Sequence, residues 1–344
     1  MNKSLQKALL QITPDIYFNT YLYPYTTFNI GGPADYVAVA RSTEHIIQMV
    51  KLCKKFSIPF KLLGGGSNVL ISDEGFRGVI IINKADHWKI QDKIKSSQQA
   101  MSSVAPRLTS VGKDFYTTEG LEYKDPQNKR VVVSVAAGAR IIPLIKMLFQ
   151  KGITGLQWFS GIPASVGGAI YMNMHGGEYF FGDFVYSALL FDGENIKKAD
   201  HDYFNFSYDW STLHETGELI LEADLLLYYG DVAKAKELSV AWARRKSLQP
   251  QKSVGCIFQN LSAEQQEKCN IPTSSIGYVI DKVLQLKGTQ KGDAQISNNH
   301  AAFIENLGQA KASDVYYLFQ LIRSKAKEKL GLDLKPEIEF IGHF

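Results

Sequence analysis

The sequence predicts an α+β chain with more than one domain, and three observations support this. Its 344 residues exceed the roughly 100–200 residues of one typical domain. A charged fraction of 21% beside a hydrophobic fraction of 45% is typical of a globular protein. Segments with the 3.6-residue period of a buried helix face alternate with short runs of β-branched residues, and glycine-rich loops separate them.

Composition excludes several classes of protein. No apolar segment reaches the roughly 18 residues of a membrane span, and the N-terminal apolar run is broken by Gln11, so we expect neither a membrane span nor a secretion signal. The formal net charge is only +4, and the sequence contains no long Lys/Arg run, so no nucleic-acid partner is expected. Cys53, Cys256 and Cys269 match no metal site and no closed disulfide framework, and the histidines are scattered. We therefore expect no metal and a reducing, cytoplasmic location.

The first predicted unit covers about residues 20–85. Ser42 is a suitable N-cap for a helix, because the apolar residues that follow it recur at helical spacing and Pro59 lies beyond them. Runs rich in β-branched and leucine residues predict strands on both sides of that helix. These strands are 36–40, 60–63, 69–71 and 78–82.

A polar insertion is predicted near 86–130, and regular structure resumes after it. The spacing of apolar residues also predicts the later segments. A domain boundary is expected near Gly230. The last helix should begin at the N-cap Ser313 and end at Gly331, because glycine readily adopts the left-handed backbone conformation of the residue that follows a helix. The predicted segments are strand 131–135, helix 143–150 and strand 219–227.

Two glycine-rich loops carry the clearest functional signal. Residues 64–68, Gly-Gly-Gly-Ser-Asn, join two strands and lack the Lys of a phosphate loop and the third glycine of a doubly wound fold. The loop can form a concave row of backbone N–H groups that binds a diphosphate, although a plain tight turn fits it equally well. A second loop, 161–169, places three glycines around Pro163. Two such loops favour a dinucleotide held by backbone amides from two places.

Segments 27–34, 63–70 and 161–169 together resemble the UDP-N-acetylenolpyruvoylglucosamine reductase (MurB) family. Similar motifs follow in the family's order at 206–208, 249–250, 255–260, 286–288, 297–300 and 334–338. The resemblance covers nearly the whole chain outside the 86–130 insertion. The short stretch between Phe206 and the strand at 219–227 is typical of the subgroup that lacks an inserted tyrosine loop.

The resemblance implies an FAD-binding fold of the vanillyl-alcohol-oxidase type at 20–230, in two subdomains of about 20–85 and 86–230. A C-terminal α+β substrate-binding domain would follow at 231–344. It also implies a flavoenzyme of peptidoglycan precursor synthesis. NADPH would reduce a non-covalently bound FAD, and a hydride would then reduce the enolpyruvyl group of the UDP-sugar to give UDP-N-acetylmuramate.

The resemblance also assigns roles to particular residues. The expected cofactor-binding residues are Gly64, Gly65, Gly66, Ser67, Asn68, Gly161, Ile162, Pro163, Ser165 and Gly168. The expected substrate-binding residues are Tyr208, Asn260 and Lys287. Glu337 falls on the family's glutamate near the substrate carboxylate.

Two positions depart from the family pattern. Cys256 stands where the family has its proton-donating serine; a thiol, with an ordinary pKa near 8.5, can donate a proton, and a buried inert cysteine is the alternative. Asp209 stands where the family has a catalytic arginine. Either another cation such as Lys287 replaces the arginine, or Asp209 points away, or the reductase activity is changed or lost. A flavoprotein with another acceptor and a non-catalytic binding protein thus remain alternatives. We expect weak turnover that Asp209→Arg increases.

Overall fold

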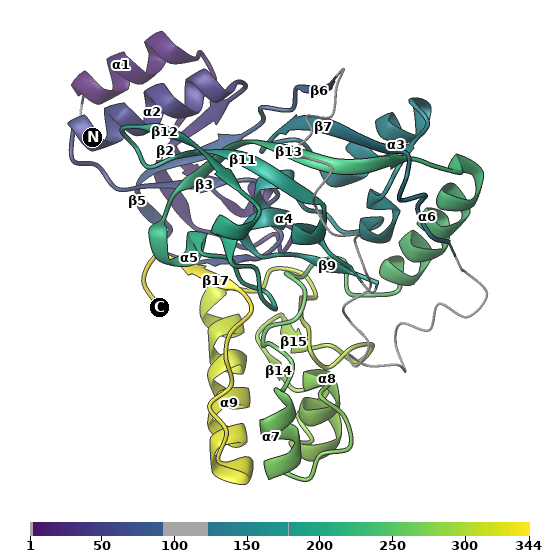
Figure 1. The fold of residues 1–344 in the computed structure, drawn as a ribbon. Helices are drawn as coiled ribbons and strands as arrows, with labels where there is room; N and C mark the ends of the chain where they lie inside the picture. The colour runs from purple at the N-terminus through teal and green to yellow at the C-terminus, as the bar shows by residue number, and fades with distance from the viewer. Residues whose placement is uncertain (1–2, 92–122, 178) are drawn as a thin grey trace.

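The computed structural model describes residues 3–91, 123–177 and 179–344 (Figure 1). Most of the predicted 86–130 insertion, residues 92–122, lies outside the described residues. Two β-sheets with their covering helices form one end of the molecule, and a smaller unit built around the long helix α9 projects from them. Of the helices in the described residues, none has the length and apolar character that crossing a membrane requires.

The first sheet has the order β1-β2-β5-β3, in which β2, β5 and β3 are parallel and β1 is antiparallel to β2. Its strands are β1 (Ile16–Tyr21), β2 (Pro33–Ala40), β3 (Phe60–Leu63) and β5 (Phe76–Asn83). Helix α2 (Thr43–Lys55) packs on this sheet, and Ser42 Oγ accepts the His45 N–H as the predicted N-cap. Helix α1 (Lys3–Ile12) packs beside α2 through the fully buried Leu5 and Leu9, so the subdomain begins before residue 20.

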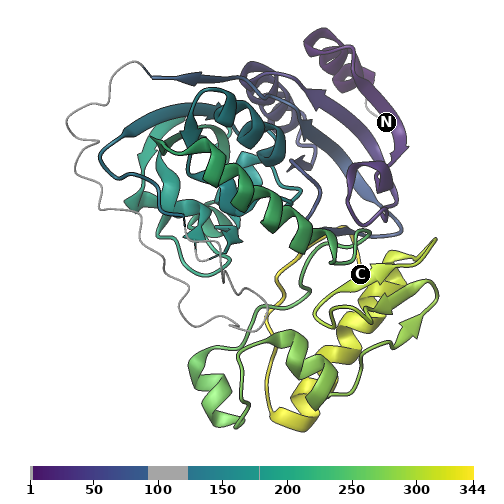
Figure 2. The same ribbon diagram turned by 90° about the vertical axis from the view of Figure 1, so that its right-hand side faces the viewer.

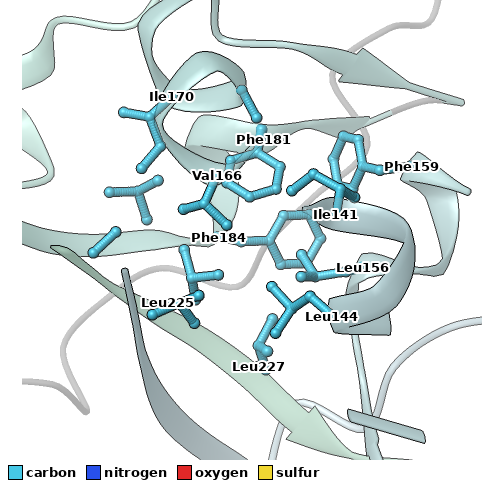
Figure 3. Packing of buried hydrophobic residues seen from close by; sticks show 14 of the residues in the cluster. Ile141, Leu144, Leu156, Phe159, Val166, Ile170, Phe181, Phe184, Leu225 and Leu227 are labelled. Carbon is cyan, nitrogen blue, oxygen red and sulfur yellow. The ribbon is translucent and has the colours of Figure 1, made fainter. Parts of the chain in front are cut away.

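The second sheet is antiparallel, with the order β12-β11-β13-β7-β6 and with β8 paired to the end of β13. Figure 3 shows its apolar face, where Phe184 lies among Ile141, Leu225 and Leu227. The strands are β6 (Trp88–Ile90), β7 (Arg130–Ala136), β8 (Ile153–Thr154), β11 (Val185–Phe191), β12 (Ile196–Asp200) and β13 (Leu219–Tyr229). The covering helices are α3 (Ile141–Gln150) and α4 (Val166–Tyr171).

Helix α6 (Val232–Ser247) belongs to this second sheet's core, which corrects the boundary expected at 230–231. Ala235, Leu238 and Trp242 are buried in the same apolar cluster as the sheet, and the rings of Trp242 and Trp158 lie 6.4 Å apart. Figure 2 shows α6 lying across that part of the molecule. Most residues of α6 are polar or charged, so the sequence did not indicate that the helix packs on this sheet. The C-terminal unit therefore begins after Ser247.

The C-terminal unit surrounds α9 (Ala312–Leu330) and returns to the first sheet's domain through β17 (Glu339–Ile341), which pairs in parallel with β4 (Val69–Ile71). Gly331 ends α9 in the left-handed conformation, as predicted. Ser313 is not its N-cap: the Asp73 carboxylate accepts the N–H groups of Ala312 and Ser313 at 2.7 and 2.9 Å. The unit's other helices and strands are α7 (Ala263–Lys268), α8 (Ile276–Tyr278), β14 (Gln290–Lys291), β15 (Ala294–Ile296) and β16 (Ile304–Asn306).

Several short elements complete the described chain. They are the strands β9 (His175–Gly176) and β10 (Tyr179–Phe180), the helix α5 (Leu213–Thr216), a π-helical turn at Val279–Val283, and 3₁₀ turns at Tyr23–Tyr25, Leu156–Phe159, Phe181–Phe184 and Asp202–Phe204.

Candidate active site

The two glycine-rich loops lie against each other. A Cβ atom at Gly64 would lie 2.2 Å from Ser165 Oγ, and one at Gly65 would lie 2.7 Å from Pro163 O. Gly66 has φ +62°, and a Cβ there would lie 2.0 Å from Tyr25 O. Backbone oxygens face the Cβ positions of Gly65 and Gly66, so the 64–68 loop requires glycine at these two positions, while Gly64 lets Ser165 approach.

This contact leaves a cradle of backbone donors. Among the described residues, no acceptor takes the N–H groups of Gly65, Gly66 or Ser67. In the second loop, Ser165 caps α4 by accepting the Gly168 N–H at 3.3 Å. Consecutive unused N–H groups without side-chain bulk suit the diphosphate of a dinucleotide. The residues of the first loop therefore fit FAD, which supplies hydride-transfer chemistry when it is bound.

We expect Gly65→Asp to weaken flavin binding, because it adds both a side chain and a negative charge to this cradle. The measurement is the ratio of flavin to protein after purification. Gly152→Asp is the control away from the cradle: no atom lies within 4 Å of a Cβ placed there, and its φ of +74° is a left-handed conformation that aspartate tolerates. Full flavin occupancy in the Gly65 variant would contradict this location of the cofactor.

Gly161 packs against helix α6, a contact that the sequence did not indicate. It has φ +84°, and a Cβ there would lie 2.8 Å from Lys246 Cβ and 3.1 Å from Ala243 Cα. The second loop thus holds the last turn of α6 and with it the Lys246 side chain. Sequence reasoning missed Lys246, which stands in a run of basic residues that looks like a solvated helix end.

Backbone pairing brings Cys256 and Glu337 close to the 64–68 loop. Cys256 forms a β-bridge with Phe303, and the Glu337 N–H donates to Ile257 O at 3.0 Å. Asn68 Nδ2, from the first glycine loop, donates to Glu337 O at 2.9 Å. Direct hydrogen bonds therefore join the segments around Asn68, Ile257 and Glu337, which are widely separated in the sequence.

Cys256, Glu337, Lys246 and Asp209 form one electrostatic cluster. Desolvation raises the pKa of the Cys256 thiol well above its usual value, Glu337 and Asp209 raise it further, and Lys246 lowers it. Desolvation likewise raises the pKa of Glu337, with Asp209 adding to the rise and Lys246 opposing it. Desolvation lowers the pKa of Lys246, while Cys256 and Glu337 raise it. The thiol and the Glu337 carboxyl therefore keep their protons to higher pH than usual.

Tyr208 and Asn260 join this cluster, whereas Lys287 does not. Asn260 Nδ2 donates to the Tyr208 hydroxyl at 3.0 Å, and its Oδ1 accepts the Ile276 N–H. Burial raises the pKa of Tyr208, and Asp209, Glu337 and Cys256 contribute to this rise. Lys287 is exposed, and its Nζ lies 3.6 Å from Asp281 Oδ2. Of the described cations, Lys246 is the one that lowers the pKa of both Cys256 and Glu337.

Asp209 faces the cluster, so the alternative that it points away is wrong. It occupies a tight turn between Ser207 and Trp210 with φ +49°, a left-handed conformation that aspartate tolerates. Its side chain is 4% exposed, and Oδ1 lies 3.4 Å from His175 Nδ1. The His175 ring stacks on Tyr208 with centroids 5.7 Å apart. Among the described residues, no donor reaches Asp209 Oδ2.

We expect Glu337→Gln to stabilise the fold at pH 8 but not at pH 4. The folded-state pKa of Glu337 is raised above its usual 4.5, so the unfolded chain releases this proton at lower pH. The carboxyl's contribution to stability is present below pH 4.5 and decreases as the pH rises. Thermal unfolding at both pH values measures the difference, with exposed Glu237→Gln as control. Equal melting shifts at the two pH values would contradict the raised pKa.

Known proteins resemble this chain over nearly its full length. A UDP-N-acetylenolpyruvoylglucosamine reductase of Caldicellulosiruptor saccharolyticus is 32% identical over 94% of this chain and 91% of its own. The reductase of Bacillus subtilis is 30% identical over 99% of both chains. The crystal structure of the reductase MurB from Thermus caldophilus has a TM-score of 0.67 at 27% identity, covering 95% of this chain and 98% of its own.

Two family models also match the sequence. An FAD binding domain matches residues 34–100, and the UDP-N-acetylenolpyruvoylglucosamine reductase C-terminal domain matches residues 248–341, which begins where α6 ends. The fold and the site define an FAD-dependent oxidoreductase. The chain belongs to the UDP-N-acetylenolpyruvoylglucosamine reductase family. The predicted fold class, an FAD-binding domain followed by this family's C-terminal domain, is confirmed.

Proposed function

We propose that the protein uses NADPH and non-covalent FAD to reduce UDP-N-acetylenolpyruvoylglucosamine to UDP-N-acetylmuramate in peptidoglycan precursor synthesis. The observation that carries this proposal is the convergence of Cys256, Glu337 and Lys246 beside Asn68 of the cofactor loop. The names of the full-length relatives support the same substrate. We also place the protein in the cytoplasm, because its three cysteines are unpaired thiols.

The chain's own residues would control charge and proton supply. In the reduction, one carbon of the enolpyruvyl double bond gains a hydride and the other gains a proton, and the π bond is lost. Negative charge then develops toward the substrate carboxylate. The Lys246 ammonium can stabilise that charge, the Cys256 thiol can donate the proton, and the protonated Glu337 carboxyl can donate a hydrogen bond to a substrate oxygen.

The test is NADPH oxidation by the purified flavoprotein with and without the enolpyruvyl UDP-sugar. Oxidation that depends on this substrate, with UDP-N-acetylmuramate as product, is the expected result. Flavin reduction without turnover of the UDP-sugar would overturn the proposal in favour of another acceptor. A protein that purifies without flavin and binds none would instead indicate a non-catalytic role.

Asp209 should limit this reaction, and we expect Asp209→Asn and Asp209→Arg both to increase kcat. The buried Asp209 carboxylate, as part of the cluster, should repel the substrate carboxylate and, more strongly, the negative charge that develops during reduction. Steady-state kinetics of the three proteins measure the effect, and the exposed Asp202→Asn is the control. If the native rate is high and both variants lower it, the Asp209–His175 pair is part of the machinery, and our assignment of Asp209 is wrong.

A further inference from the structure

Arg140 lies at the junction of the two glycine-rich loops. It precedes α3 and forms an antiparallel β-bridge with Ser165 of the second loop. The next residue donates its N–H to Ala164 O at 3.0 Å. Backbone pairing therefore fixes the start of the Arg140 side chain beside the second loop.

The Arg140 guanidinium reaches across to the first loop. Its Nη1 lies 3.2 Å from the position that a Cβ of Gly65 would occupy. Its Nη2 donates to Pro163 O at 3.4 Å, which is longer than an ordinary N–H···O hydrogen bond. The cationic group thus lies directly over the cradle whose backbone N–H groups have no acceptor among the described residues.

Arg140 has unused hydrogen-bond donors and no carboxylate partner among the described residues. A guanidinium has five N–H donors, and in the described part of the chain one long bond to a carbonyl is its only hydrogen bond. No Asp or Glu of the described residues forms an ion pair with it. Arg140 is half-buried, and desolvation lowers its pKa. A partly desolvated guanidinium with unused donors is well suited to bind an anion.

We propose that Arg140 binds the diphosphate of FAD by charge-assisted hydrogen bonds, so that this cradle combines backbone amides with one positive charge. The planar fork of arginine suits two phosphate oxygens at once. The inference rests on FAD binding within the proposed function and is independent of the substrate that is reduced. A phosphate of NADPH has the same chemistry, and the experiment separates the two dinucleotides.

The experiment titrates FAD into flavin-free protein and follows flavin fluorescence at several salt concentrations. We expect Arg140→Met to raise the Kd for FAD by ~10–100-fold, as for loss of hydrogen bonds to a charged group. The dependence of that Kd on salt should become shallower, because one charge contact is lost. Arg140→Lys should restore part of the affinity. Arg323→Met is the control, since Arg323 on α9 forms an exposed ion pair with Asp333, which follows that helix.

Three results would overturn the proposal. The first is an unchanged Kd for FAD in Arg140→Met. The second is weaker binding with an unchanged salt dependence and no rescue by lysine, which would indicate damage to the loops. The third is normal FAD binding with a raised KM for NADPH, which would assign Arg140 to the nicotinamide dinucleotide. A variant series that behaves as expected while the enzyme fails to reduce the UDP-sugar would leave Arg140 in place and reject only the proposed substrate.

Discussion

Cys256→Ala is expected to lower kcat by ~10²–10⁴-fold, the usual effect of removing a general acid, whereas Cys256→Ser should retain much of the rate. Cys256 lies in the cluster with Glu337 and Lys246, where a thiol or a hydroxyl can hold the transferable proton and a methyl group cannot. Flavin reduction by NADPH should proceed normally in both variants, because the proton is needed only when the substrate is reduced. Steady-state and single-turnover kinetics separate these two steps.

The pH dependence provides a second test of Cys256. A proton donor acts in its protonated form, so activity is present below its pKa and decreases as the pH rises through it. Desolvation and Glu337 raise this pKa, so the alkaline decline should lie above the ordinary thiol value of about 8.5. Cys256→Ser should lack that decline. Undiminished turnover in Cys256→Ala would remove the thiol from the mechanism, with Cys269→Ala, a partly buried thiol in the C-terminal unit, as the control.

Lys246→Met is expected to lower kcat/KM by ~10²–10³-fold, the typical loss when one preorganised stabiliser of developing charge is removed. Lys246 is the cation that acts on both Cys256 and Glu337, and no arginine occupies the position of Asp209. Flavin content should stay unchanged, which separates this effect from loss of the cofactor. Steady-state kinetics with the UDP-sugar give the measurement.

Two neighbouring cations are suitable controls for Lys246. Arg244→Met changes an exposed residue on the same helical turn, and Lys287→Met changes the cation that the sequence alone suggested. Both variants should retain most of the wild-type kcat/KM, because Lys287 lies beside Asp281 and outside the cluster. A larger loss for Lys287→Met than for Lys246→Met would reverse this assignment.

Local interactions explain why much of the fold was predictable. The Ser42 cap and the Gly331 stop depend on side chains and backbone angles within one helical turn, so they are readable from the sequence. The glycines of the 64–68 loop were recognisable for a similar reason, since three consecutive glycines between strands indicate close backbone approach. The structure shows that the partner in this approach is the second loop.

Position in the family pattern identified Cys256, Glu337 and Asp209 as candidates, but it did not define their charged environment. Lys246 enters the site because Gly161 lets the last turn of α6 approach the second loop, a contact between segments about 85 residues apart in the sequence. Asp73 caps α9 from 239 residues away in the sequence, so the nearest suitable residue in the sequence, Ser313, was the wrong choice. Local propensity carries no information about such contacts.

The sequence by itself thus determined several of the helices and strands, such as α2 and the end of α9, together with the two glycine-rich loops and the reductase family. These properties depend on short-range periodicity, on backbone angles that few residues tolerate, and on motifs that remain together along the chain. Only the tertiary structure decided that Lys246 acts on Cys256, that α6 packs on the second sheet, and that Arg140 lies over the unused backbone N–H groups of the 64–68 loop. Electrostatic and packing free energies depend on distances in space, and separation along the chain does not specify those distances.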